Sequence, residues 1–276
     1  MTENDSVAKA LAFRALHARP GGFVIPNPWD AGSARILEAL GFEALATTSA
    51  GFAFSLGVRD GSVDRARTLE NASAIVRATS LPVSADLENG FGRQPEAIAE
   101  TIRMASATGL VGGSIEDASG EPEDAVYAFD HAVERVAAAA QAARSLAIPF
   151  VLTARAENFR LGRPDLDDTI RRLQAFEKAG ADVLYAPSLP TIEAVRAVCR
   201  AVSKPVNFVA GLGSTRFSVA ELIDAGVRRI SLGSALARAA LGGLVRAARE
   251  IQRDGTFDFA AEALSYSDAN AFMREA

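Results

Sequence analysis

Acidic side chains cluster in three short segments of this chain, and they are its most chemically suggestive residues. The acids concerned are Asp86 and Glu88 in PVSADLENGFG, Glu116 and Asp117 at the end of GGSIED, and Asp60 in GVRDG. Carboxylates that converge on a small volume repel each other unless a cation or shared protons compensate. These segments contain no His or Cys, so their ligand atoms are hard oxygens, which suit Mg²⁺ or Mn²⁺ and not zinc.

The spacing of these acids predicts which of them share a site. On an extended strand Asp86 and Glu88 point to the same side, whereas Glu116 and Asp117 point to opposite sides. A single Asp at the end of a strand is more often a cap or an ion-pair partner than a ligand, and we interpret Asp117 in that way. Several acids at the ends of neighbouring strands are harder to explain structurally. We therefore predict a metal site formed by Asp60, Asp86, Glu88 and Glu116.

Arg155 lies in the otherwise apolar run VLTARAEN, two positions before Glu157. A buried guanidinium without a partner is costly, so Arg155 either pairs with Glu157 or binds the carboxylate of a substrate. We favour the substrate. His17, His131 and Cys199 lie in helical patterns away from the ends of strands, and we assign no chemistry to them.

The elements that position these residues alternate along the chain. Short runs rich in β-branched residues predict strands at 22–27, 44–49, 81–88, 113–117, 149–156, 181–186, 205–210 and 229–233. Amphipathic or alanine-rich segments predict helices at 31–40, 64–79, 95–108, 123–146, 166–179, 192–202 and 219–225. Eight βα units predict an α/β fold, a (β/α)8 TIM barrel, with a doubly wound open sheet as the alternative. The active sites of such barrels lie where the strands end, which is where the acids lie.

No linker or change in composition divides the chain, so we predict a single domain over residues 1–276. A helix at about 235–253 follows the last predicted strand, and the tail after it carries Phe257, Phe259, Tyr266 and Phe272. So many aromatic residues after the barrel has closed predict that the segment at about 235–276 packs on a neighbouring subunit.

The composition argues against several classes of protein. A net charge of −5 and a pI near 5.3 disfavour nucleic acid or an anionic membrane as a partner. One cysteine excludes an internal disulfide framework, and the acidic amino-terminal segment is unlike a signal peptide. No apolar stretch approaches the ~20 residues that span a bilayer. We therefore expect a cytoplasmic protein.

Together these motifs resemble those of the isocitrate lyase/phosphoenolpyruvate mutase superfamily. The segment from GFEA at 41–44 to GVRD at 57–60 resembles one family signature. PVSADLENGFG resembles the metal-binding signature, with Glu88 in place of a second Asp. SIED at 114–117 and ARAE at 154–157 are similar to two further family strands, and the similarity continues to nearly residue 235.

The resemblance implies a barrel whose last helix is exchanged between paired subunits, in a dimer or commonly a tetramer. It also implies Mg²⁺ bound directly by Asp86, with Asp60, Glu88 and Glu116 contributing largely through water. The candidate catalytic residues are Asp60, Glu116 and Arg155.

The resemblance further implies the contacts of a small carboxylic acid substrate. The substrate would be held by Arg155, by backbone N–H groups around Thr48, Ser49 and Ala50, and by Asn207. The implied activity is that of a Mg²⁺-dependent lyase or decarboxylase that breaks a carbon–carbon bond of a 2-oxo or 2-hydroxy acid through a metal-stabilised enolate.

The sequence departs from the family where a proton is transferred. The family's lyases carry a KKCGH motif after the fourth strand, but the corresponding stretch here is ASGEPED at 118–124, without Lys, Cys or His. The candidates for the missing proton donor are Tyr127, Asp130 and His131, on position alone. The missing cysteine shifts our expectation towards a decarboxylase or an unusual lyase.

Three alternatives stay open. A mutase or hydrolase acting on a carbon–phosphorus bond would share the metal site but would need a group to manage the phosphoryl. A biosynthetic barrel would bind phosphate through the backbone of GLGST at 211–215. A barrel without activity would serve as a binding or assembly protein, and the intact set of acids argues against it.

Overall fold

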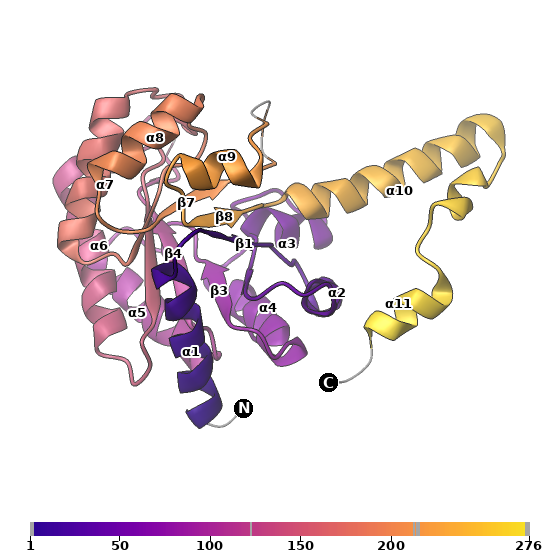
Figure 1. Cartoon of the computed structure of the whole chain (residues 1–276), viewed down its shortest axis with the longest axis horizontal. Coiled ribbons are helices and arrows are strands. Elements are labelled where there is room, and N and C mark those ends of the chain that lie inside the picture. The colour runs from indigo at the N-terminus through magenta and orange to yellow at the C-terminus, as the bar shows by residue number, and fades with distance from the viewer. Residues whose placement is uncertain (1–2, 122, 212, 214–215, 274–276) are drawn as a thin grey trace.

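Eight parallel strands curve into a barrel with helices around it (Figure 1). The computed structural model describes residues 3–121, 123–211, 213 and 216–273. The strands are β1 (Phe23–Ile25), β2 (Leu45–Ala46), β3 (Val83–Asp86), β4 (Gly112–Glu116), β5 (Val151–Arg155), β6 (Val183–Tyr185), β7 (Val206–Val209) and β8 (Arg229–Ser231). Each strand from β2 to β7 pairs with the next along the chain, and β8 pairs with β1. The (β/α)8 prediction is confirmed and the open doubly wound alternative is wrong.

Helices alternate with these strands, and local signals explain several of their ends. They are α1 (Glu3–Ala18), α2 (Ala31–Ala39), α3 (Ser49–Ser55), α4 (Arg65–Ala78), α5 (Pro95–Ala107), α6 (Phe129–Arg144), α7 (Leu166–Ala179), α8 (Ile192–Ala201), α9 (Val219–Asp224), α10 (Ala235–Asp254), the 3-10 helix η1 (Asp258–Ala261) and α11 (Tyr266–Phe272). The side chains of Asp64 and Asp165 cap α4 and α7 by accepting backbone N–H groups of the first turn. α7 ends at Gly180, whose φ of 110° favours glycine.

The barrel closes between β1 and β2 through few contacts. Within the described residues no ladder joins these two strands, and the chain after β1 begins with Pro26, which has no N–H. The amide of Ala46 donates instead to the Pro26 carbonyl over 3.0 Å. The Asn27 side chain donates to the Thr47 carbonyl over 2.9 Å and accepts the amides of residues 232 and 233. Asn27 therefore joins the ends of β1, β2 and β8.

Two predicted boundaries are wrong, and two helices were not predicted. β3 ends at Asp86, not at residue 88. The helix predicted at 123–146 begins only at Phe129, and before it Ala118 and Val126 form an isolated antiparallel β-bridge. α1 was not predicted, and α3 begins directly after the second strand, where loop was expected.

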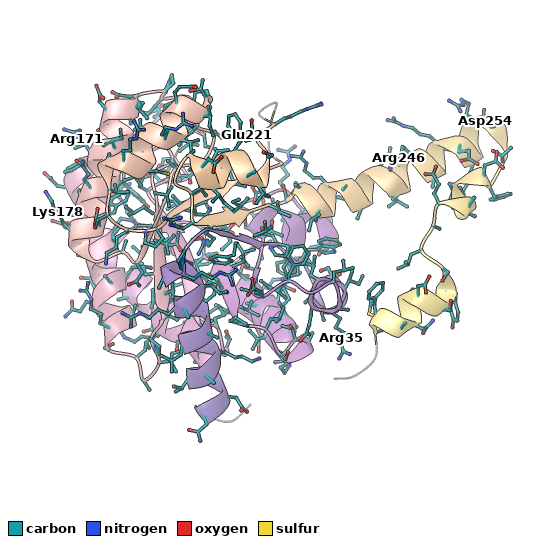
Figure 2. The ribbon with its side chains drawn as sticks, in the orientation of Figure 1. Arg35, Arg171, Lys178, Glu221, Arg246 and Asp254 are labelled. Carbon is teal, nitrogen blue, oxygen red and sulfur yellow. The ribbon has the colours of Figure 1, made fainter. Side chains whose placement is uncertain are left out.

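α10 extends away from the barrel (Figure 1). Its exposed apolar residues are Leu241, Leu244, Val245 and Ile251. Figure 2 shows the charged side chains of Arg246 and Asp254 on the same helix. The chain then folds back, and Arg35 of α2 donates to the Met273 carbonyl over 3.2 Å. None of the described helices is long and apolar enough to cross a membrane.

His17, near the end of α1, is buried against two aromatic rings. It packs edge-on against Phe13 and Phe23, with centroids 4.7 Å and 5.0 Å away. Its Nδ1 lies 2.8 Å from the Phe13 carbonyl, so Nδ1–H is the donor, and Nε2 has no hydrogen-bond partner in the described part of the chain. Burial, and then the nearby charge of Arg229, lowers the pKa of His17 to about 3.

Because of His17, we expect the free energy of unfolding to decrease in acid. The unfolded chain protonates His17 near its ordinary pKa of about 6.5, whereas the folded chain resists protonation, so stability falls as the pH drops below that value. At pH 5 we expect a loss of about 2 kcal/mol relative to pH 7 from this group. Replacing His17 with Phe should remove that part of the pH dependence, measured by urea unfolding at both pH values. Equal pH dependence in the two proteins would show that His17 does not contribute.

Candidate active site

The acids predicted to share a site line one cavity at the carboxyl ends of the strands. Its volume is about 810 Å³. Of the predicted site residues, it is lined by Thr48, Ser49, Ala50, Asp60, Asp86, Glu88, Glu116 and Arg155. They come from the ends of β2 to β5 and the loops that follow, as the barrel geometry requires.

Arg155, the last residue of β5, lies at the centre of the charged groups. Its Nη1 lies 3.0 Å from Asp86 Oδ1, its Nη2 3.0 Å from Glu116 Oε2, and its Nε 2.8 Å from Glu157 Oε1. These contacts result from register, because β4 pairs with both neighbours and Glu116 lies directly opposite Arg155. From the sequence, Glu157 was the alternative partner of Arg155 and a substrate carboxylate was favoured; in the structure all three guanidinium nitrogens bind carboxylates of the chain, Glu157 among them.

Glu157 and Asp117 support this cluster from behind. Glu157 is fully buried and also binds Arg160, whose Nε lies 2.6 Å from Glu157 Oε2. Asp117 accepts the amide of Glu157 over 2.8 Å and pairs with the buried Arg172 over 3.1 Å. Asp117 therefore has the structural role expected from its position, and it ties the end of β4 to the end of β5.

Asp86 and Glu88 both face the cavity, although not for the reason that the sequence suggested. Asp86 ends β3, and its Oδ2 accepts the Ser49 hydroxyl over 3.0 Å. Glu88 lies beyond the strand in the left-handed region, with a φ of 48°. Strand alternation thus does not place Glu88. A turn places Glu88 there, and contacts with surrounding residues offset the strain of its backbone conformation.

Arg135 of α6 holds that turn in place. It is buried, and it donates to the backbone carbonyls of Gly92, over 2.7 Å, of Arg93, over 2.5 Å, and of Asn89. Its guanidinium also lies over the Tyr127 ring, 4.1 Å from the centroid. Arg135 has no carboxylate partner within the described residues. Its guanidinium instead binds the backbone carbonyls of the loop that carries Glu88 into the cavity.

The cavity carries more negative than positive charge. Five acids and three arginines line it among the described residues, an excess of two negative charges. Burial, reinforced by Asp86 and Asp60, raises the pKa of Glu88 to about 7. Burial also raises the pKa of Glu116, with Glu157 and Asp86 opposing Arg155. Burial is the main cause of both shifts, and neighbouring carboxylates add to them.

This donor set fits a hard divalent cation. The lining offers carboxylate oxygens and no His or Cys among the described residues, and one divalent ion would offset the excess charge. No group of three described acids, histidines or cysteines is arranged as a ready ligand set. The arrangement therefore fits an ion that is bound directly by one or two carboxylates and keeps water molecules as its other ligands, as Mg²⁺ commonly does.

Sequence analysis missed one residue of the cavity, Tyr185. It ends β6 directly opposite Arg155, and its ring lies 4.9 Å from the guanidinium carbon. It lines the cavity although it is only 8% exposed, and its hydroxyl has no hydrogen-bond partner within the described residues. Burial raises the pKa of Tyr185 above its usual range, so the phenol stays protonated. The signal was available, since a polar residue ending a barrel strand is a candidate in itself.

Comparison with known families decides what kind of protein this is. The model of the phosphoenolpyruvate phosphomutase family matches residues 13–252, which include every residue of the site. The chain belongs to this family. The predicted membership of the isocitrate lyase/phosphoenolpyruvate mutase superfamily is confirmed.

Other members of the family give a range of activities. A candidate lyase/mutase from Burkholderia cenocepacia J2315 is 56% identical, with a TM-score of 0.97, and the match covers 99% of this chain and 98% of that one. A 2,3-dimethylmalate lyase is 28% identical, with a TM-score of 0.85 and 96% and 95% covered. A 2-methylisocitrate lyase from Shewanella oneidensis is 29% identical, with 89% and 86% covered. Lyases and mutases therefore share this fold.

The remaining predicted residues lie elsewhere. Asn207 is buried inside the barrel, where its Oδ1 accepts Arg229 Nε over 2.8 Å, and it is not among the residues that line the cavity. The proposed proton donors Tyr127, Asp130 and His131 do not line it either. Of the loop 211–215 considered as a phosphate site, residues 212, 214 and 215 lie outside the described residues.

Proposed function

We propose that this family member is a Mg²⁺-dependent lyase or decarboxylase that breaks a carbon–carbon bond of a small 2-oxo or 2-hydroxy acid. The observation that carries the proposal is the cluster of Asp86, Glu88 and Glu116 around Arg155 in one cavity. The two relatives named as lyases act on small branched acids, as their names state.

Asp86 is the proposed direct ligand of Mg²⁺, with Asp60, Glu88 and Glu116 contributing through water. When bound, the ion supplies a Lewis acid that stabilises the negative charge of an enolate. The raised pKa of Glu88 supports this assignment, because burial and neighbouring acids leave that carboxylate in need of a cation.

The chain's own residues would orient the substrate. Arg155 provides the positive charge closest to the acids and would hold a substrate carboxylate with charge-assisted hydrogen bonds. Thr48, Ser49 and Ala50, where α3 begins, line the same cavity, and their backbone N–H groups would contact the same carboxylate or the enolate oxygen. Ser49 would also fix the orientation of Asp86.

Tyr185 is the group that we propose as the proton donor. In a decarboxylation the carbon–carbon bond breaks, carbon dioxide leaves, and the electron pair of the bond passes into the enolate, whose carbon then takes a proton from the phenol. The resulting phenolate would be stabilised by Arg155, 4.9 Å from the ring centroid, and would regain a proton from water. In the cleavage of a hydroxy acid the leaving fragment is a carbonyl compound, and the proton of its hydroxyl would pass to a carboxylate of the cavity. No His, Cys or Lys lines the cavity among the described residues, which leaves the phenol and the carboxylic acids as donors.

Replacing Tyr185 with Phe should lower kcat by about 100-fold to 1000-fold, within the range of general acid–base catalysis, and leave KM nearly unchanged. The ring and its contact with Arg155 are retained in this variant. Ser188, another hydroxyl in the lining, offers a matched control, and Ser188→Ala should keep most of its activity. Equal activity of the two variants would assign the proton to another group.

A substrate screen tests the reaction class. Purified protein would be incubated with oxaloacetate, 2-methylisocitrate, 2,3-dimethylmalate and phosphonopyruvate, with Mg²⁺ or with EDTA, and the products followed by NMR. Mg²⁺-dependent cleavage of a carbon–carbon bond supports the proposal. Turnover of phosphonopyruvate alone would establish the carbon–phosphorus alternative, and absence of both turnover and Mg²⁺ binding would indicate a barrel without activity.

The assembly is a further part of the proposal. An extended α10 with exposed Leu241, Leu244 and Val245 on one face suits exchange with a second copy, which would bury that face. We propose a homo-oligomer, a dimer or a tetramer, in which α10 packs on the neighbouring subunit. A cytoplasmic location stays a prediction.

A charge on that face should prevent assembly. Leu244, 65% exposed in the isolated chain, would be buried in the oligomer, so Leu244→Asp should yield a monomer in light scattering after size exclusion. Arg246→Ala, on the opposite face of α10, should assemble like the wild type. An oligomer that survives Leu244→Asp would place the interface elsewhere.

A further inference from the structure

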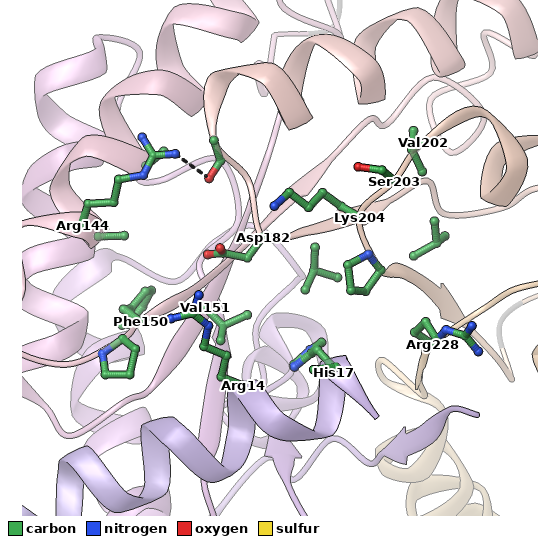
Figure 3. A pocket seen from close by; sticks show the side chains of 18 of the residues that line it. Arg14, His17, Arg144, Phe150, Val151, Asp182, Val202, Ser203, Lys204 and Arg228 are labelled. Carbon is green, nitrogen blue, oxygen red and sulfur yellow. Dashed lines mark hydrogen bonds between the residues drawn. The ribbon is translucent and has the colours of Figure 1, made fainter. Parts of the chain in front are cut away.

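A second cavity, of about 850 Å³, lies at the end of the barrel opposite to the acids (Figure 3). It is surrounded by the starts of β5, β6 and β7 and by the carboxyl-terminal ends of α1, α6 and α8. Apolar side chains form part of its wall, among them Phe150, Val151 and Val202. The proposed reaction makes no use of it.

The charge of this cavity is opposite to that of the catalytic one. Its charged residues are Arg14, Arg144, Lys204 and Arg228, with Asp182 as the one acid among the described lining residues. Figure 3 shows Arg14 and Lys204 reaching towards Asp182 from different elements. None of the four cations forms an ion pair within the described residues, although the chain as a whole has a net charge of −5.

The carboxyl ends of the helices account for only two of the four cations in this cavity. Carbonyl groups at a helix carboxyl end carry a partial negative charge of about half a unit, and cations often neutralise it. Arg144 donates to the Gly180 carbonyl over 3.5 Å, and Arg228 to the Gly21 carbonyl over 2.9 Å. Arg14 and Lys204 have no such acceptor within the described residues. Arg14 and Lys204 are thus exposed at the cavity, on the side of Asp182 but without an ion pair to it within the described residues.

We propose that this cavity binds a small organic anion with at least two negative charges, as phosphate or carboxylate groups, at a site separate from the catalytic one. Arg14 and Lys204 would bind the charged groups, and the apolar wall would contact the carbon skeleton. β5 and β6 begin here and end at Arg155 and Tyr185. A bound anion would therefore join α1, which carries Arg14, to the segment before β7, which carries Lys204, beside the starts of the two strands that lead to the centre of the catalytic cavity.

Thermal unfolding with two probes tests the site. Pyrophosphate and citrate would be titrated separately, without metal, against NaCl of equal ionic strength. A saturable rise in Tm with either probe at millimolar concentration is expected, because a ligand that binds only the folded state stabilises it. The probe with the larger rise identifies phosphate or carboxylate as the preferred group. No saturable rise with either probe overturns the proposal.

Variants locate the binding. The double variant Arg14→Gln/Lys204→Gln should lose the rise in Tm and keep its response to Mg²⁺ and oxalate at the other end of the barrel. Lys178→Gln, an exposed lysine in the last turn of α7 outside the lining, is the matched control and should keep the rise. If the double variant does not fold, calorimetric titration of Lys204→Gln should still show at least tenfold weaker binding. Unchanged binding in these variants overturns the assignment.

Discussion

Replacing Arg155 with methionine should abolish turnover and lower the free energy of unfolding by about 3–5 kcal/mol, the range for breaking a buried ion pair from one side. Arg155 contacts Asp86, Glu116 and Glu157 within 3.0 Å, so methionine fills the space but leaves three acids facing each other. Activity assays and urea unfolding measure the two effects.

The pH dependence of this variant shows whether lost charge or lost packing lowers its stability. Burial raises the pKa of Glu116 even beside Arg155, and loss of the guanidinium would raise that pKa further. The folded variant would then bind more protons than the unfolded chain, so its stability would fall as the pH rises. The deficit of Arg155→Met should therefore be smaller at pH 5 than at pH 8. Arg160→Met is the control, since that side chain is 44% exposed, and we expect a loss below about 1 kcal/mol. A deficit independent of pH would mean that lost packing, not charge, is responsible.

Replacing Asp86 with alanine should remove Mg²⁺-dependent binding of oxalate, a mimic of the enolate of pyruvate, and lower kcat by at least about 1000-fold. Asp86 is the one acid that contacts both Arg155 and Ser49, and it contributes to the raised pKa of Glu88. Calorimetric titration with Mg²⁺ and oxalate measures the binding, and a crystal soaked with both shows its place.

The stability of the same variant distinguishes a functional acid from a structural one. Asp86→Ala relieves repulsion on Glu88 but costs one contact of Arg155, so we expect a change within about 1 kcal/mol. Asp60→Ala, at an exposed position in the lining, should reduce metal affinity much less. Oxalate binding that survives in Asp86→Ala would contradict the proposed ligand, and a cavity that binds no oxalate in the wild type would contradict the metal site.

Much of the architecture was predictable because its signals are local. Apolar runs alternating with amphipathic helices encode a parallel sheet covered by helices, and eight such units encode a closed barrel. The same pattern predicts that Asp86, Glu116 and Arg155, which end β3, β4 and β5, meet at one rim, as they do. For these residues the sequence was sufficient, since all parallel strands end on the same side.

Contacts across the barrel depended on the tertiary structure. Strand register, which no single segment encodes, places Glu116 and Tyr185 on either side of Arg155 and so decides its partners. The position of Glu88 depends on a left-handed turn held by Arg135, which lies 47 positions further along the chain. Alternation along a strand cannot anticipate such a turn, because it applies only where the backbone stays extended.

The sequence by itself determined the fold class, the family and the set of acids at the rim. Only the tertiary structure decided that Asn207 lies inside the barrel, that Tyr185 lines the same cavity as the acids and that Arg14 and Lys204 line a second cavity at the opposite end. The physical reason is the range of the forces involved. Hydrophobic periodicity and capping act over a few residues, whereas the distance between two side chains depends on how every strand between them is packed.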